Sequence, residues 1–171
     1  MKIKAIVLDV DGVLTDGKVY VSADGKEMKS LCYRDIMGIS LAQKAGIRFA
    51  LVSGECGDLL FEISMRCDVA ANDVYSNILD KAVSVRDFAQ RRGFDLQEIA
   101  YMGDDVNDIE AMKIVGRACA PADACEELNT EPVGFVWVMD SPGGNGAVRD
   151  MIDRILAGWP ADDAVVSEDA L

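Results

Sequence analysis

Short apolar runs alternate with longer amphipathic segments along most of the chain. Runs of four or five aliphatic residues are typical of buried parallel strands, and here they alternate with stretches whose apolar positions recur every three to four residues. Strands are expected at about 4–8, 48–52, 69–71, 99–102, 117–120 and 135–138, and helices at about 36–45, 58–66, 78–92, 109–115, 122–128 and 147–156. This alternation predicts an α/β fold with a doubly wound, Rossmann-like parallel sheet.

Two polar residues stand where helix caps are expected. Asp35 precedes the apolar positions of helix 36–45, and Asn77 precedes helix 78–92. Asp and Asn are favoured N-cap residues because their side chains accept hydrogen bonds from the first free N–H groups of a helix. We therefore expect Asp35 and Asn77 to be N-caps.

A hairpin interrupts the alternation directly after the first strand. Strand-like residues 18–21 and 27–33 flank the sequence Ala-Asp-Gly-Lys, and Asp-Gly between two such runs is a strong turn signal. We expect a β-hairpin insertion at residues 17–34. The chain has no internal repeat and no linker, so residues 1–158 are expected to form one domain, followed by a flexible acidic tail at residues 159–171.

Composition narrows the classes of function. The 171 residues include 17 Lys and Arg against 30 Asp and Glu, a net charge of −13, which argues against a nucleic-acid or membrane partner. The chain has no histidine, and its five cysteines form no Cys-x-x-Cys pair. Zinc sites and Ser-His-Asp or Cys-His catalysts are therefore not expected. Free thiols and an N-terminus without an apolar signal segment predict a cytoplasmic protein.

Polar clusters follow three of the predicted strands. Asp9 and Asp11 end the first strand, and Ser53-Gly54 ends the strand at 48–52. The strand at 99–102 is followed by the third cluster, Asp104, Asp105 and Asp108. In doubly wound sheets, ligands bind beyond the carboxyl ends of the strands, so the three clusters are expected to meet at one edge.

Carboxylates gathered without histidine or paired cysteine favour a hard cation, most simply Mg²⁺. Asp9, Asp104 and a backbone carbonyl near Asp11 would suffice to hold it. Phosphoryl transfer is then the natural chemistry, with one carboxylate as nucleophile and a second as acid and base. A hydroxyl and a lysine, Lys81, would hold the transferring group. Lys81 falls in the first turn of a predicted helix, where a cation is unfavourable unless an anion is near.

The same residues resemble the four motifs of the haloacid dehalogenase superfamily of phosphatases. The motifs are Asp-x-Asp-Gly-Val-Leu-Thr from residue 9, Ser53-Gly54, Lys81, and Gly-Asp-Asp-x-Asn-Asp from residue 103. The resemblance implies that Asp9 is a nucleophile forming an aspartyl-phosphate and Asp11 a general acid and base. It also implies phosphate-binding residues, Ser53, Gly54 and Lys81; metal ligands, Asp9, Asp11 and Asp104; and residues that orient the metal's surroundings, Asp105 and Asp108.

A narrower resemblance covers most of the chain. The hairpin, Arg34-Asp35 with Gly38, and the glycine-rich segment before Arg149 are similar to the 3-deoxy-manno-octulosonate 8-phosphate phosphatase group. That group implies a fold without a large cap domain, a homotetramer assembled through the hairpin, and active sites covered by neighbouring subunits. Arg34 is then placed to contact an acidic substrate, and loop 141–146 to close over a sugar.

One departure bears on the substrate. The octulosonate phosphatases usually carry Thr-Gly-Arg at the second motif, whereas this chain has Ser-Gly-Glu, with Glu55 in the last position. Glu55 removes a cation that could hold a substrate carboxylate. It resembles instead the branch that acts on 2-keto-3-deoxy-nonulosonate 9-phosphate, so Glu55 is a candidate substrate-binding residue. The expected reaction is hydrolysis of an ulosonic acid phosphate, with the nine-carbon 9-phosphate favoured over the eight-carbon 8-phosphate.

Two other classes of function remain open from the residues alone. A receiver-type signalling domain also combines acidic residues, a hydroxyl, a lysine and Mg²⁺, but its phosphoacceptor aspartate stands apart from the acidic pair. A phosphatase-like domain kept only for assembly would have no reason to retain Asp9, Asp11, Ser53, Lys81 and Asp104 together.

Overall fold

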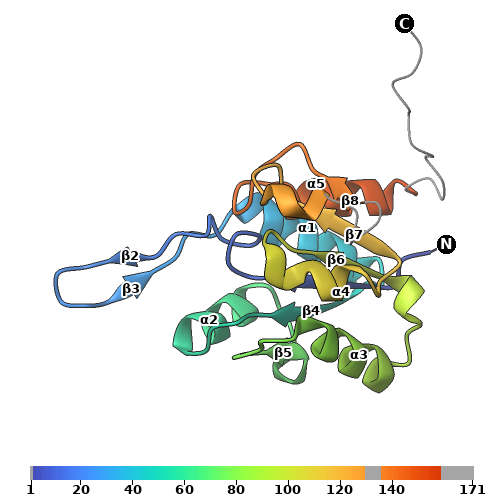
Figure 1. The fold of residues 1–171 in the computed structure, drawn as a ribbon, viewed down its shortest axis with the longest axis horizontal. Coiled ribbons are helices and arrows are strands. Elements are labelled where there is room, and N and C mark those ends of the chain that lie inside the picture. Colours follow the sequence, from blue (N-terminus) through green and yellow to red (C-terminus); the bar gives the residue numbers. More distant parts are fainter. Residues whose placement is uncertain (1, 130–135, 159–171) are drawn as a thin grey trace, which may run out of the picture.

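A computed structural model describes residues 2–129 and 136–158 of the chain. Its centre is a parallel sheet of six strands in the order β5-β4-β1-β6-β7-β8 (Figure 1). The strands are β1 Ala5–Asp9, β4 Arg48–Val52, β5 Val74–Tyr75, β6 Ile99–Met102, β7 Arg117–Ala120 and β8 Val136–Val138. The helices are α1 Tyr33–Lys44, α2 Asp58–Arg66, α3 Lys81–Arg92, α4 Ile109–Met112 and α5 Ala147–Leu156. The predicted doubly wound α/β fold is confirmed.

Alternating side chains of the buried strands supply two separate cores. Ile6 and Leu8 of β1 face a cluster that includes residues of α1, α2 and α5, whereas Val7 faces one that includes residues of α3 and α4. Successive strand residues point to opposite faces of a sheet, so a continuous apolar run such as β1 fits a strand covered by helices on both sides. Strand β1 lies between β4 and β6, which places its carboxyl end at the middle of one sheet edge.

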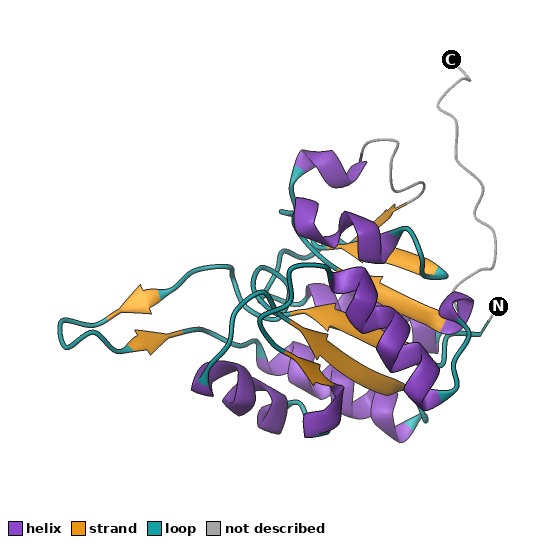
Figure 2. Cartoon of the chain, turned by 60° about the horizontal axis from the view of Figure 1, so that its bottom comes forward, coloured by secondary structure: helices purple, strands orange, loops and turns teal. Residues whose placement is uncertain are grey.

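The hairpin is the insertion between β1 and α1. Strands β2 Tyr20–Val21 and β3 Glu27–Met28 pair antiparallel, with Tyr20 opposite Met28, and extend away from the core (Figures 1 and 2). No large cap domain is present within the described residues. None of the described helices has the length and apolar character needed to cross a membrane. The predicted tail at 159–171 lies outside the described residues.

The predicted strand at 69–71 is wrong. Residues Ala71–Asp73 form a 3₁₀ turn, and the edge strand is β5, where Val74 and Tyr75 pair with Leu51 and Val52. A short apolar run cannot by itself show which residues reach the sheet edge. The predicted helix at 122–128 is also replaced, by a 3₁₀ turn at Glu126–Asn129.

Asn77 is not the cap of α3. Its φ is 57°, in the left-handed region, and the helix begins four residues later, with the Asp80 side chain accepting a hydrogen bond from the Ala82 N–H. The backbone N–H groups of residues 77 and 78 instead donate to the carbonyls of Glu55 and Ser53. These contacts draw the segment before α3 against the loop that follows β4.

Asp35 is not the cap of α1 either. It lies inside α1 and is buried, and its carboxylate accepts hydrogen bonds from the backbone N–H of Gly146 at 3.1 Å and of Arg149 at 2.8 Å. These donors belong to the N-terminus of α5, where a negative charge is favoured. The prediction that Asp35 caps its own helix is therefore wrong, and its carboxylate instead binds the start of a helix more than a hundred residues away.

The glycine-rich loop 141–146 packs against the loop that follows β1. A Cβ on Gly143 would lie 1.7 Å from the Gly12 carbonyl oxygen, and the Gly144 N–H donates to the Val13 carbonyl at 2.9 Å. Glycine is required at position 143 because any side chain would overlap backbone. The loop therefore packs against the chain that follows Asp11.

Candidate active site

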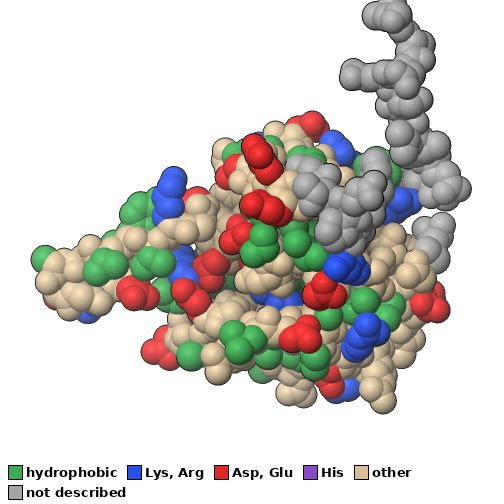
Figure 3. All heavy atoms as spheres, in the orientation of Figure 1, with side chains coloured by type: hydrophobic (Ala, Val, Ile, Leu, Met, Phe, Trp, Pro, Cys, Tyr) green, Lys and Arg blue, Asp and Glu red, His purple; other side chains and the backbone are tan. Residues whose placement is uncertain are grey.

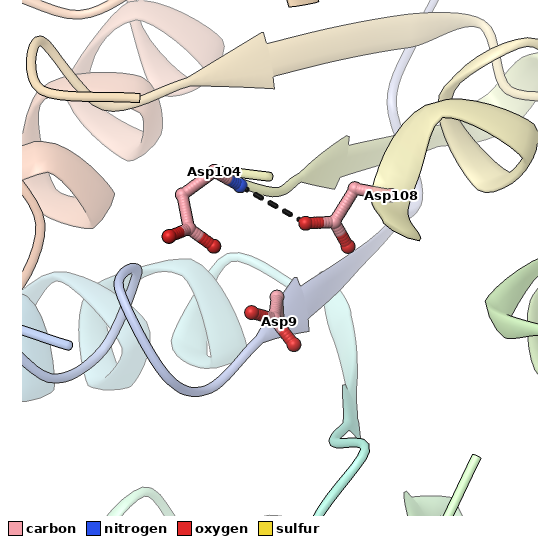
Figure 4. A group of neighbouring side chains, drawn as sticks. All are labelled: Asp9, Asp104 and Asp108. Atoms are coloured by element: carbon pink, nitrogen blue, oxygen red, sulfur yellow. Dashed lines mark hydrogen bonds between the residues drawn. The ribbon is translucent and has the colours of Figure 1, made fainter. Parts of the chain in front are cut away.

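Three carboxylates meet at the carboxyl edge of the sheet. Asp9 ends β1, while Asp104 and Asp108 follow the neighbouring strand β6. One carboxylate oxygen from each lies within 4.8 Å of the others (Figure 4). Because β1 and β6 are adjacent and parallel, residues almost a hundred positions apart in sequence become neighbours.

Asp108 organises this cluster. Its fully buried carboxylate accepts hydrogen bonds from the Tyr101 hydroxyl at 2.5 Å and Lys81 Nζ at 2.8 Å on one oxygen, and from the backbone N–H groups of Asp104 and Asp105 at 3.0 and 3.2 Å on the other. A Cβ on Gly103 would lie 2.2 Å from the Asp108 carboxyl carbon. Glycine at 103 thus allows the close approach, and Asp108 fixes both the lysine and the loop that carries Asp104.

Lys81 is a buried cation at the first position of α3. Its Nζ donates to Asp9 at 2.8 Å, to Asp108 at 2.8 Å and to Asn107 at 3.3 Å, which uses all three donors of an ammonium. Burial by itself lowers the pKa of Lys81, but the charges of Asp9 and Asp108 outweigh burial and raise the pKa above its ordinary value. Lys81 therefore remains charged.

One lysine does not balance the negative charge of the cluster. Burial and the Asp108 charge raise the pKa of Asp104 to about 6. Burial, with the same neighbour, raises the pKa of Asp9 well above its ordinary value despite the opposing Lys81 charge. Burial and the neighbouring like charge both disfavour the ionised carboxylates, and a bound cation would offset this cost. Oxygen donors at this spacing fit a hard divalent cation.

The second motif lies on the loop after β4. Ser53 is buried, and its hydroxyl accepts a hydrogen bond from the Glu55 backbone N–H at 3.0 Å. Gly54 is exposed on the same loop. A cavity of about 210 Å³ joins this loop to the acidic cluster, and it is lined by Asp9, Asp11, Ser53, Gly54, Glu55, Lys81, Asp104, Asp105 and Asn107.

Asp11 faces a cation from the hairpin. Lys29 Nζ lies 2.6 Å from Asp11 Oδ1 and 2.7 Å from Glu55 Oε2. A second cavity, of about 440 Å³, adjoins the first and shares Asp11, Ser53 and Glu55 with it. The rest of its lining comes from Val10, from hairpin residues around Lys29, and from residues 56–60 and Ile63 before and within α2. The larger cavity offers space on the side of Asp11 away from the acidic cluster.

Not every predicted site residue joins the cluster. Arg34 lies at the start of α1 and donates to the Asn145 carbonyl at 2.7 Å, so its guanidinium is held by the glycine-rich loop. Asp105 accepts a hydrogen bond from the Val106 N–H at 2.7 Å and lines the smaller cavity without contacting Lys81. Nine of the ten predicted residues line the smaller cavity or belong to the acidic cluster, and Arg34 does neither.

Three residues of the site were missed from the sequence. Tyr101 and Asn107 carried a signal, because they stand within or beside the motif that contains Asp108, and they contact Asp108 and Lys81. Lys29 carried none. A lysine in a short exposed hairpin reads as a solvated residue, and only the folded hairpin brings it to Asp11.

Comparisons with known proteins agree with this geometry. The family model for a haloacid dehalogenase-like hydrolase matches residues 64–131, the part that holds Lys81 and the acidic turn after β6. The 3-deoxy-D-manno-octulosonate 8-phosphate phosphatase of Haemophilus influenzae is 34% identical over 154 residues, which cover 90% of this chain and 83% of that protein. The Escherichia coli K12 protein of the same name is 33% identical over 155 residues, covering 90% of this chain and 79% of that protein.

Solved structures of the same group superpose closely. The Moraxella catarrhalis phosphatase of that name, in complex with a magnesium ion, a phosphate ion and KDO, has a TM-score of 0.83 at 27% identity and covers 91% of this chain and 86% of its own. The cobalt-bound Haemophilus influenzae phosphatase has a TM-score of 0.83 at 33% identity and covers 91% of this chain and 88% of its own.

Proposed function

Since the chain belongs to the haloacid dehalogenase-like hydrolases and is a phosphoric monoester hydrolase, we propose that it hydrolyses the phosphate ester of an ulosonic sugar acid through an aspartyl-phosphate on Asp9. One observation carries the proposal. Asp9, Lys81 and Asp104 share a small cavity with Ser53, and this cavity adjoins a larger one at Asp11. A phosphoryl group fits the first cavity and the sugar the second. We therefore do not propose a receiver-type signalling domain or a phosphatase-like domain kept only for assembly as the function.

The cofactor is Mg²⁺, and the donor set fits it. Both Asp108 oxygens are occupied by hydrogen bonds from the protein, which leaves Asp9 and Asp104 as the carboxylate ligands, with a backbone carbonyl from Asp11. When bound, magnesium supplies positive charge that offsets the negative charge of the phosphate oxygens. Lys81 adds a second positive charge on the same group.

In the first step, a carboxylate oxygen of Asp9 forms a bond to phosphorus and the bond between phosphorus and the sugar oxygen breaks. Asp11 gives its proton to the departing alkoxide, which leaves as a neutral alcohol. Ser53 and Lys81 hold the phosphoryl oxygens. Lys81 does so by exchanging its longest hydrogen bond, the one to Asn107, for a phosphate oxygen.

In the second step, water replaces the sugar. Asp11, now ionised, takes a proton from the water as its oxygen attacks phosphorus, and the bond between phosphorus and Asp9 breaks. Inorganic phosphate leaves, Asp9 is again a free carboxylate, and Asp11 is again protonated. The same carboxyl group therefore serves as acid and then as base.

Two observations favour different sugars. Glu55 lines both cavities, and its presence in place of an arginine favours a nine-carbon acid carrying a 9-phosphate. The similar proteins are 3-deoxy-manno-octulosonate 8-phosphate phosphatases, which favours the eight-carbon ester. The nine-carbon substrate is our proposal, and the eight-carbon one is its rival.

A turnover panel of the two ulosonic acid phosphates separates them. We expect kcat/KM for the nine-carbon ester to exceed that for the eight-carbon ester about tenfold. A few polar contacts to the substrate are enough to produce a ratio of this size. Glu55→Arg should move the ratio toward the eight-carbon ester, while Glu55→Gln serves as the uncharged control. A higher kcat/KM for the eight-carbon ester in the wild type would reject the nine-carbon proposal and leave a phosphatase of the relatives' substrate.

The hairpin supports assembly into a homotetramer. Its exposed side chains include Val19, Tyr20, Val21 and Met28, each with 44–66% of its surface accessible, and Figure 3 shows apolar side chains along it. A ribbon of two short strands is marginally stable alone, so pairing with other subunits would cover these side chains and hold the ribbon. All five cysteines are free, which supports our placement of this assembly in the cytoplasm.

Light scattering should therefore give about four times the chain mass of 18.5 kDa. Val21→Lys, which puts charge on the most exposed of these apolar positions, should lower that mass. The matched change Val83→Lys, at a similarly exposed position on α3, should not. A monomeric wild type would reject the role of the hairpin in assembly.

A further inference from the structure

Lys29 is a half-buried residue with a largely covered side chain on an otherwise exposed hairpin. Only 6% of its side chain is accessible, and its ammonium bridges Asp11 Oδ1 and Glu55 Oε2 at 2.6 and 2.7 Å. Burial by itself lowers the pKa of Lys29, but the hydrogen bonds to the two carboxylates outweigh it and raise the pKa. Lys29 therefore stays charged at neutral pH.

The contacts of Asp11 are confined to one of its two oxygens. Lys29 Nζ donates to Oδ1, and the buried Thr15 hydroxyl also donates to Oδ1 at 3.4 Å. Within the described part of the chain, no donor lies within hydrogen-bond distance of Oδ2. This arrangement holds the orientation of the carboxyl group through Oδ1 and leaves Oδ2 available to a substrate in the two cavities that Asp11 lines.

Lys81 is not placed to do this. Lys81 is bound to Asp9, Asn107 and Asp108, on the side of the cavity where the phosphoryl group would sit. Lys29 reaches Asp11 from the hairpin, on the side of the larger cavity. Lys81 is therefore placed at the phosphoryl end of the ester bond, and Lys29 at the alcohol end.

We propose that Lys29 is a positioning residue for the reaction, which fixes the carboxyl group of Asp11 so that its free oxygen delivers the proton to the leaving alcohol. This inference rests on the proposed function, because it assigns Asp11 the role of acid. It gives the hairpin a part in catalysis within its own subunit, separate from its part in assembly. Glu55 holds the other side of the Lys29 ammonium, so the pair also ties the second motif to the acid.

The test compares two leaving groups in Lys29→Met, which keeps the length of the side chain and removes its charge. The p-nitrophenolate anion leaves without a proton, whereas an unactivated alkyl alcohol needs one. We expect kcat/KM for an alkyl phosphate to fall about tenfold more than kcat/KM for p-nitrophenyl phosphate, since misorienting an acid removes part of its contribution. Lys29→Arg should restore the ratio to within about threefold, because its donors can reach the same oxygen.

Controls separate positioning from assembly and folding. Lys18→Met makes the same change at a hairpin lysine whose side chain is 71% accessible, and we expect it to leave the ratio unchanged. In an Asp11→Asn background, Lys29→Met should change the ratio no further, because the group that it orients is already gone. Equal losses for both esters, or no loss, would overturn the proposal. Failure of the wild type on both sugar acids, with these simple esters still hydrolysed, would reject the proposed substrate and leave the Lys29 test intact.

Discussion

Asp9→Asn is expected to abolish phosphate release, with kcat reduced about 10⁴-fold or more. An amide oxygen is a poor nucleophile toward phosphorus, and no other carboxylate can take the place of Asp9. Asp108 is bound through both of its oxygens, and Asp104 is the proposed metal ligand. The measurement is release of inorganic phosphate under saturating substrate and magnesium. Asp68→Asn, an exposed aspartate with a left-handed φ of 51° at the far end of the sheet, is the matched control.

The same substitution should not unfold the protein. The raised pKa of Asp9, which follows from burial and the Asp108 charge, means that the ionised carboxylate is less stable in the folded state than in the unfolded one. At pH 7 this charge therefore opposes folding. Removing it should leave the melting temperature of the metal-free protein equal or higher. Unchanged turnover in a folded Asp9→Asn protein would exclude Asp9 as the nucleophile.

The meeting of the three motifs could be predicted because parallel strands share a direction. Asp9, Ser53 and Asp104 each follow a buried apolar run, and any doubly wound sheet that contains those strands brings their carboxyl ends to one edge. No knowledge of side-chain geometry was needed. The roles of the individual residues came from the family resemblance and remain predictions.

Contacts made across long separations could not be predicted in this way. Asp35 obeys the local preference for an acidic residue at a helix start, yet its carboxylate reaches Gly146 and Arg149. Lys29 lies in a segment whose polar pattern is that of a solvated hairpin, and only the angle at which the hairpin leaves the core brings it to Asp11. Sequence periodicity fixes which face a residue occupies but not which distant element covers that face.

Asp11→Asn is expected to slow the first step by an amount that depends on the leaving group. For an alkyl phosphate, kcat/KM should fall about 10³-fold, within the range supplied by a general acid, because the leaving alkoxide no longer receives a proton. For p-nitrophenyl phosphate, kcat/KM should fall less than about tenfold, since its leaving group needs no acid. Asparagine still accepts a hydrogen bond from Lys29 through its amide oxygen, so the local contacts change little.

The second step, attack of water on the covalent intermediate, tests the role of Asp11 as a base. With p-nitrophenyl phosphate, kcat should fall much more than kcat/KM, because asparagine cannot take a proton from the attacking water. Rapid mixing should then show a burst of nitrophenolate of about one equivalent per active site, followed by slow turnover, as a covalent intermediate accumulates. Acid quenching during the slow phase should trap phosphate on the protein, and the Asp9→Asn, Asp11→Asn double variant should give neither burst nor label. Equal losses in kcat/KM for the two esters would contradict the acid role. A burst that persists in the double variant would place the phosphoryl group on a residue other than Asp9, because the acceptor is defined by the carboxylate whose removal prevents labelling.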